Sequence, residues 1–363
     1  MWSVCFTAQM AFTLPSGGSR LKISHRVQTL MSGGEPPCLP LLLTFDLDDT
    51  LWPTKPVIKA ANDALLEHLD SAGVETTAAS IRNRMKILRT MSDEPLTYRK
   101  QRTLAIEQEM QYQMIKEGMD SSNLGLVAEF DDEADVHYQG WLHARHVAAS
   151  ECLYRDVVPA LESIRRSHGK ALIVGAVTNG CGDPLETRAL APLFDFCVSA
   201  EDADVFPERK PSRRPFDKAL AYAAQIVRVG GAGSSSGAGS PGDEMRDDKS
   251  TSASATRPSA TEAPPPPAPP TPVTWIHVGK DLRQDVAAST AAGAAAVWVR
   301  PDGFSIDTAF TSAFYRETFS AEQLEEKRRA CEVALEAADA TIDGIVELPA
   351  AVAAILAAQR DEI

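Results

Sequence analysis

The sequence predicts an α/β fold: a doubly wound parallel sheet, Rossmann-like, with an all-helical cap inserted after the first strand. Three observations predict it. Short apolar runs each end in a cluster of polar residues, which is typical of buried parallel strands. Amphipathic helical patterns separate these runs, as in a βαβ alternation. Residues 56–155 carry helical patterns only and interrupt the alternation after the first run.

Four apolar runs are predicted to be strands of the sheet. Helical patterns over residues 159–166 and 216–227 predict the crossover helices between them. Ligands of doubly wound sheets bind outside the carboxyl ends of the strands, so we expect the functional site among the polar clusters. The four runs are residues 39–45, followed by Asp46-Leu47-Asp48-Asp49; 171–177, followed by Thr178-Asn179-Gly180; 275–278, followed by Gly279-Lys280-Asp281; and 294–299, followed by Arg300-Pro301-Asp302-Gly303.

The predicted cap consists of about four helices separated by glycine or proline. A helical unit inserted at this point would lie over the carboxyl edge of the sheet, where it can close on a substrate and exclude water. The predicted helices are residues 57–69, 78–90, 96–116 and 133–150, and the residues that punctuate them are Gly73, Pro95 and Gly118.

Composition favours a soluble enzyme that acts on a small molecule. Fifty acidic against 36 basic side chains give a net charge of −14, which disfavours a nucleic-acid binder because phosphate contacts need clustered Lys and Arg. No apolar run of the length that a membrane-spanning helix needs occurs. The six cysteines are scattered without a C-x-x-C pair, so neither a zinc site nor a disulfide framework is indicated. The composition indicates no oligomeric state.

Two segments are predicted to lie outside the fold. Residues 1–34 contain no Asp or Glu but several basic residues and serines, so residues 1–38 are predicted to be a plastid transit peptide. If this segment does not target the protein to a plastid, we expect a cytoplasmic protein. A terminus with no targeting role, or translation from Met31, explains the same composition. Residues 230–272 hold 34 Gly, Pro, Ser, Ala or Thr among 43 and are predicted to be a disordered insertion. The core is then residues 39–55, 156–229 and 273–354, and the cap is residues 56–155.

The acidic cluster after the first strand is the most specific feature of the chain. Asp46 ends the strand and the chain must turn at once, so Asp46 and Asp48 can face one pocket although they are two residues apart. Two carboxylates at such an edge suit a Mg²⁺ ion and covalent chemistry in which one attacks phosphorus and the other handles protons. The alternative is a solvated acidic turn in which Asp48 or Asp49 caps a helix.

Four segments of the chain, including three of these clusters, resemble in order the four signatures of the haloacid dehalogenase-like hydrolases. In that resemblance Asp46 and Asp48 belong to the first motif, Thr178 to the second and Lys210, in Glu208-Arg209-Lys210-Pro211, to the third. The fourth is Gly279 to Val286. The resemblance implies that Asp46 forms an aspartyl-phosphate, that Asp48 protonates the leaving oxygen and then activates water, that Thr178 and Lys210 bind the phosphoryl group, and that Mg²⁺ is held by Asp46, Asp48, Asp281 and Asp285.

Residues 46–58, the helical cap, residues 277–286 and Trp298-Val299-Arg300-Pro301 together carry a second resemblance. They resemble the bacterial phosphatase that acts on FMN and on 5-amino-6-(5-phospho-D-ribitylamino)uracil in riboflavin synthesis. That resemblance implies a small phosphorylated substrate, bound by Thr178, Asn179 and Lys210 and by Arg99 and Arg102 of the cap. Arginines at this spacing usually lie on a solvated helix face, which is the alternative for Arg99 and Arg102. A dehalogenase is disfavoured, because expelling a halide needs no acid and Asp48 would have no task.

One position departs from the family pattern. The fourth motif normally has Asp directly after its glycine, and here that residue is Lys280. Either Asp281 takes over as a metal ligand, with Asp285 one helical turn further on, or the metal site is impaired. A lysine among carboxylates would repel Mg²⁺ and could pair with Asp46 in its place. A catalytically reduced member that binds a phosphorylated ligand as a regulatory or scaffold protein therefore stays open as a second hypothesis.

Overall fold

The computed structural model describes residues 40–118, 129–232, 273–311 and 318–361. At its centre the described residues form a six-stranded sheet in which every neighbouring pair is parallel. The predicted fold class is thereby confirmed. In their order across the sheet the strands are β3 (Phe196–Ser199), β2 (Leu172–Thr178), β1 (Leu41–Phe45), β4 (Thr274–Gly279), β5 (Ala295–Val299) and β6 (Ala340–Ile342).

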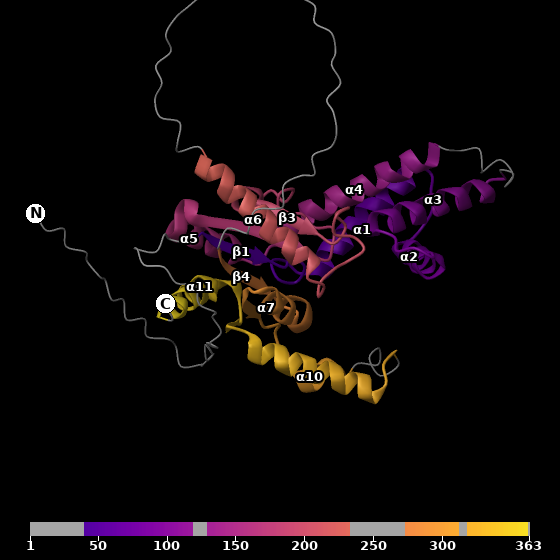
Figure 1. The fold of residues 1–363 in the computed structure, drawn as a ribbon. Helices are drawn as coiled ribbons and strands as arrows, with labels where there is room; N and C mark the ends of the chain where they lie inside the picture. Colours follow the sequence, from indigo (N-terminus) through magenta and orange to yellow (C-terminus); the bar gives the residue numbers. More distant parts are fainter. Residues whose placement is uncertain (1–39, 119–128, 233–272, 312–317, 362–363) are drawn as a thin grey trace, which may run out of the picture.

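Helices cover both faces of this sheet (Figure 1). α5 (Val157–His168) and α11 (Leu348–Asp361) pack in one apolar cluster with alternate residues of β1, and α6 (Arg214–Ala232) and α7 (Ala288–Ala292) pack in another. Side chains alternate between the faces of a strand, so Leu42 of β1 meets α6 while its neighbours meet α5. All five residues of β1 are buried, which is why the central strands are continuous apolar runs.

The helical unit after β1 is present and has an apolar core of its own. It consists of α1 (Thr54–Ser71), α2 (Ala78–Met91), α3 (Tyr98–Lys116) and α4 (Glu129–Glu151), which extend to one side of the sheet in Figure 1. Trp141 is fully buried at the centre of its cluster. We call α1–α4 the cap. The remaining elements are η2 (Gly169–Ala171), η3 (Ala191–Leu193), η4 (Leu282–Ala287), α8 (Ile306–Ala309), α10 (Ala321–Ala337) and η5 (Ile345–Glu347).

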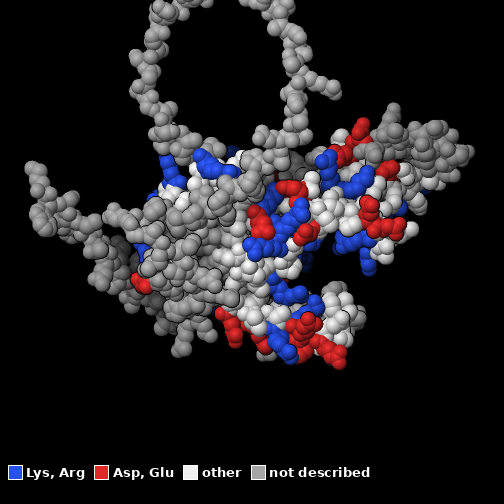
Figure 2. Space-filling view, viewed as in Figure 1, with Lys and Arg blue, Asp and Glu red and all other residues white. Residues whose placement is uncertain are grey.

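The two segments predicted to lie outside the fold fall almost entirely outside the described residues. The predicted transit peptide, residues 1–38, is wholly outside them, and so are residues 233–272 of the predicted insertion. Residues 230–232 belong to α6, so the helix runs three residues past the predicted start of the insertion. Among the described helices none is long and apolar enough to cross a membrane. Acidic and basic side chains are mixed on the face shown in Figure 2.

Candidate active site

The parallel register brings the predicted motifs to one edge of the sheet. Asp46 follows β1, Thr178 ends β2 and Gly279 ends β4, and β1 pairs with both of the other strands. The Asp46 amide donates to the carbonyl of Val278 at 2.9 Å, so the sheet still holds the backbone of Asp46. A side chain at this position therefore lies between the second and the fourth motif.

Asp49 makes the sharp turn that follows Asp46. Its φ of 57° lies in the left-handed region, which Asp tolerates better than most residues. The Leu51 amide closes the turn by donating to the Leu47 carbonyl at 2.9 Å. Asp48 then lines the main pocket of the site, whereas Asp46 is only 8% exposed and is not among the residues that line it. The two carboxylates thus lie at different depths.

Lys210 is the cation that lies against the buried carboxylates. Its Nζ donates to Asp46 Oδ1 at 2.8 Å and to Asp285 Oδ1 at 2.7 Å, and its side chain is 1% exposed. Thr50 Oγ1 donates to the other oxygen of Asp46 at 2.9 Å. Each oxygen of Asp46 is therefore held by one donor, which fixes the orientation of the carboxylate.

Burial and charge act against each other on these three groups. Burial raises the pKa of Asp46 to about 6, although Lys210 opposes the shift. Burial also acts to raise the pKa of Asp285, but Lys210 and His277 outweigh it and the pKa is lowered. The pKa of Lys210 would fall on burial, yet the charges of Asp285 and Asp46 raise it. Lys210 and Asp285 are therefore a charged pair, whereas the pKa of Asp46 lies above its usual range.

Asn179 positions Lys210 and also lines the main pocket. Its Nδ2 donates to the Lys210 carbonyl at 2.9 Å and to Gln284 Oε1 at 2.8 Å, while its Oδ1 accepts from the Lys210 amide at 2.7 Å. Thr178 is 1% exposed, and its Oγ1 accepts from the Gly180 amide at 3.1 Å. Since that bond uses only an acceptor site, the Thr178 hydroxyl proton is available to another acceptor.

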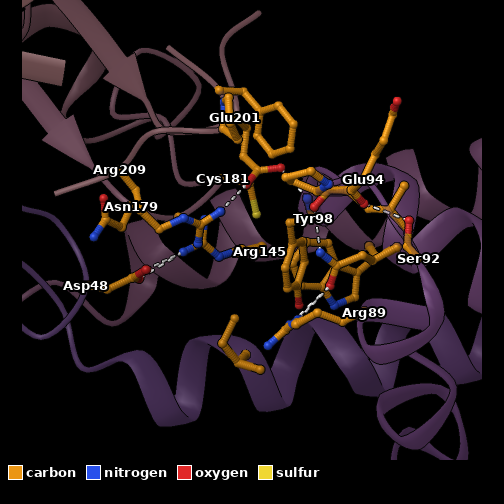
Figure 3. Close-up of a pocket in the computed structure, with 18 of the residues that line it drawn as sticks. Asp48, Arg89, Ser92, Glu94, Tyr98, Arg145, Asn179, Cys181, Glu201 and Arg209 are labelled. Atoms are coloured by element: carbon orange, nitrogen blue, oxygen red, sulfur yellow. Dashed lines mark hydrogen bonds and ion pairs between the residues drawn. The ribbon is translucent and has the colours of Figure 1, made fainter. Parts of the chain in front are cut away.

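Asp48 meets an arginine that the sequence analysis did not single out. Arg145, on α4 of the cap, approaches both oxygens of Asp48 through Nη2 at 2.8 Å (Figure 3). The indole of Trp52 donates to Asp48 Oδ1 at 3.0 Å. Arg145 lies within an ordinary helical pattern, 97 residues from Asp48, and no motif marks it. Only the position of the cap over the sheet brings the two residues together.

The fourth motif is arranged differently from what the family resemblance implied. Lys280 forms an ion pair with Asp49, not with Asp46. Asp281 is the N-cap of η4, and its Oδ1 accepts from the amides of Arg283 and Gln284 at 2.9 and 2.7 Å. Asp281 thus accepts from the N-terminal amides of a helix, a common role of Asp.

The described residues do not form the Mg²⁺ site expected from Asp46, Asp48, Asp281 and Asp285. No group of three or more His, Cys, Asp or Glu side chains within the described ranges is placed to hold a metal ion. Three cations already contact the acidic side chains of the edge: Lys210 on Asp46 and Asp285, Arg145 on Asp48, and Lys280 on Asp49. A resident divalent cation would add two further positive charges among them.

The main pocket lies between the cap and the loops of the sheet edge and has a volume of about 570 Å³. Tyr98 of the cap supplies an aromatic wall, and charged groups include Asp48, Arg145 and Arg209 (Figure 3). Arg209 and Glu201 both line this pocket, and Arg209 Nη2 lies 3.6 Å from Glu201 Oε1. The pocket can therefore take a ligand that combines an apolar ring with an anion.

The two cap arginines predicted to bind substrate are engaged elsewhere. Arg99 forms a bidentate ion pair with Asp135, in which Nε donates to Oδ1 at 3.0 Å and Nη2 donates to Oδ2 at 2.8 Å. Arg102 is 6% exposed, lies 4.0 Å from the centroid of the Trp141 ring and donates to Asn62 at 3.2 Å. Neither is among the residues that line the main pocket. Arg102 packs the cap, and Arg99 joins α3 to α4.

Solved structures similar to this chain include enzymes with the same type of fold. The chain is similar to the crystal structure of a 2-haloacid dehalogenase from Pseudomonas syringae, with 22% identity, a TM-score of 0.51, and coverage of 87% of this chain and 99% of that one. It is also similar to a HAD-hydrolase, YfnB, from Bacillus subtilis bound to magnesium, with 15% identity, a TM-score of 0.37, and coverage of 74% of this chain and 92% of that one. A HAD phosphatase from Thermococcus onnurineus is similar with 16% identity, a TM-score of 0.35, and coverage of 85% of this chain and 95% of that one. No curated protein matches the sequence.

A protein-family model described as haloacid dehalogenase-like hydrolase matches residues 41–225, slightly more than half of the chain. The matched segment contains Asp46, Asp48, Thr178 and Lys210, the residues that the sequence analysis assigned to the first three motifs. The chain therefore belongs to the haloacid dehalogenase-like hydrolases.

Proposed function

We propose that the chain is a phosphomonoester hydrolase that acts through an aspartyl-phosphate on Asp46. The observation that carries the proposal is the contact of Lys210 Nζ with both Asp46 and Asp285 at the edge of the sheet. A phosphoryl group in transfer spreads negative charge over its oxygens, and a fixed ammonium beside the nucleophile stabilises that charge without rearrangement. Membership of the family supports hydrolysis but is common to phosphatases and dehalogenases.

Asp48 supports a phosphate ester over a haloacid as the substrate. An alkoxide leaving group needs a proton and the second step needs an activated water, and a carboxyl group at the pocket wall serves both. Asp46 attacks phosphorus as the ester oxygen leaves with the proton of Asp48. Asp48 then removes a proton from water, which attacks phosphorus and releases phosphate and Asp46. Lys210 and Thr178 hold the phosphoryl oxygens in both steps.

A ring-bearing phosphate is the substrate class that the pocket fits best. Tyr98 supplies an aromatic wall, and about 570 Å³ accommodates more than a phosphate group. Both features support FMN or 5-amino-6-(5-phospho-D-ribitylamino)uracil, the substrates implied by the sequence resemblance. The N-terminal segment, which contains no Asp or Glu over residues 1–34, supports a plastid location for this activity.

A panel assay tests the proposed function. The purified chain is incubated with p-nitrophenyl phosphate, FMN, a sugar phosphate, a nucleoside monophosphate and a 2-haloacid, and phosphate or halide release is measured. The proposal expects phosphate release, fastest from FMN or a related ring-bearing ester. Halide release with no phosphate release would contradict it. Phosphate binding without any turnover would instead favour the second candidate, a catalytically reduced member, which the presence of Lys280 at an acidic position of the motif supports.

Substitution of Lys280 tests the role of Mg²⁺. Because the carboxylates of the edge already contact cations, we expect the turnover of the wild type to be unchanged by EDTA. Lys280→Asp removes a positive charge and adds a ligand beside Asp49, so it should create Mg²⁺ binding and Mg²⁺-stimulated turnover. Lys280→Gln is the matched control, since it removes the charge without adding a ligand.

Calorimetric titration with Mg²⁺ and turnover with and without EDTA measure both expectations. Loss of wild-type turnover in EDTA, restored by Mg²⁺, would show that the described carboxylates rearrange to bind the ion.

A further inference from the structure

Arg145 is a buried cation with unused hydrogen-bond donors. Its side chain is 3% exposed, and only Nη2 has a partner, the carboxylate of Asp48. Nε and Nη1 are buried and make no hydrogen bond in the structure. Unpaired donors on a buried cation are costly, and a guanidinium presents its donors in a planar fork that matches the oxygens of an anion. Nε and Nη1 of Arg145 are therefore available to donate hydrogen bonds to an anion.

The loop after β2 leaves room for this guanidinium. A Cβ built on Gly182 would lie 2.7 Å from Arg145 Nη1, which is closer than real contacts allow. A Cβ built on Gly180 would lie 3.0 Å from Asp48 Oδ2 and 3.6 Å from both Arg145 Nη2 and Thr178 Oγ1. The position beside Gly180 is thus shared by the cap arginine, the second carboxylate and the predicted phosphate-binding hydroxyl.

The contact between Arg145 and Asp48 also conflicts with the proposed task of Asp48. Both oxygens of Asp48 accept from the same guanidinium nitrogen, so neither presents a proton to a leaving group. An arriving phosphoryl group supplies several anionic oxygens for the guanidinium. Moving Arg145 onto those oxygens would satisfy its donors and free Asp48 in one exchange.

We propose that Arg145 is a substrate-binding residue of the cap, which exchanges Asp48 for the oxygens of the substrate's phosphoryl group. The proposal rests on the proposed phosphatase function and adds the residue by which the cap recognises the phosphate. Arg145 reaches the shared position from α4, whereas Thr178 and Lys210 reach the edge from the sheet and its loops. The bound phosphate is thereby held between the cap and the core.

Inorganic phosphate binding and the hydrolysis of p-nitrophenyl phosphate test this proposal in the full chain. Arg145→Met keeps the approximate length and apolar stem but removes the donors, so it should weaken phosphate binding by about tenfold or more and raise KM similarly. Arg145→Lys keeps the charge, so its phosphate affinity and KM should lie between those of Arg145→Met and the wild type. Arg165→Met is the matched control: Arg165 also pairs with a carboxylate, Asp195 at 3.1 Å, but on α5 outside the pocket. It should leave phosphate binding within about twofold.

Phosphate affinity and KM of Arg145→Met equal to those of the wild type would overturn the role of Arg145 while leaving the proposed function intact. A wild type that neither binds phosphate nor hydrolyses the ester would overturn both. If Arg145→Met does not fold, as judged by thermal unfolding, Arg145→Lys decides alone, and affinity equal to the wild type overturns the proposal.

Discussion

Asp46→Asn is expected to abolish turnover, with a loss of about a thousandfold or more, while phosphate binding and folding are retained. The amide has nearly the shape of the carboxylate, but it lacks the charge that attacks phosphorus. Lys210 keeps Asp285 as its anionic partner in the variant, so no buried cation is left unpaired. Turnover of p-nitrophenyl phosphate, phosphate binding and melting temperature together measure these effects.

Asp63→Asn is the control for this substitution. Asp63 forms an exposed ion pair with Lys59 at 2.6 Å on α1 and has no contact with the site. It should leave turnover unchanged. An Asp46→Asn variant that retains turnover within about tenfold of the wild type would show that another group attacks phosphorus.

Lys210→Met should cause the largest loss of stability of any substitution at the site, about 3 to 5 kcal/mol in the free energy of unfolding. It removes the ammonium that contacts both buried carboxylates, and it leaves Asp46 and Asp285 without that shared cation. Adding Asp285→Asn removes one of the unpaired charges, so the double variant should be less destabilised than the sum of the two single variants.

Lys218→Met is a matched control for Lys210→Met because Lys218 also contacts two carboxylates, those of Asp202 and Asp204. Asp204 is 68% exposed, so water screens this cluster and its loss should cost about 1 kcal/mol or less. Equilibrium unfolding in urea measures the free energy of unfolding of all four variants. A cost for Lys210→Met no greater than that for Lys218→Met would contradict the account of a buried, charge-paired lysine.

The central strands were predictable because each is buried on both faces and therefore reads as a continuous apolar run. β1, β2, β4 and β5 were all identified, with ends within two residues of the structure. β3 and β6 were not predicted as strands, since they contain only four and three residues and alternate in burial. Runs this short carry too little periodicity to separate a strand from a loop.

The site was predictable where it follows from the order of the strands or, for Lys210, from the resemblance of its motif to the family. Parallel pairing alone brings Asp46, Thr178 and the fourth motif to one edge, and the sequence therefore indicated them. The contact of Arg145 with Asp48 depends on how the cap lies over the sheet, for which the sequence holds no periodic signal. For Asp281, the family resemblance implied a metal ligand, but an Asp before a helix is equally suited to cap it, and in the structure it does so.

The most direct test of the central claim is to trap the covalent intermediate. The wild type and Asp48→Asn are mixed with excess p-nitrophenyl phosphate, quenched in acid and digested, and the peptides are analysed by mass spectrometry. Since p-nitrophenolate leaves without much help from an acid but the second step needs a base, Asp48→Asn should accumulate the intermediate. The account predicts a burst of p-nitrophenolate matched by one phosphoryl group on Asp46. Turnover with no burst and no phosphoryl group on Asp46 in either protein would contradict it.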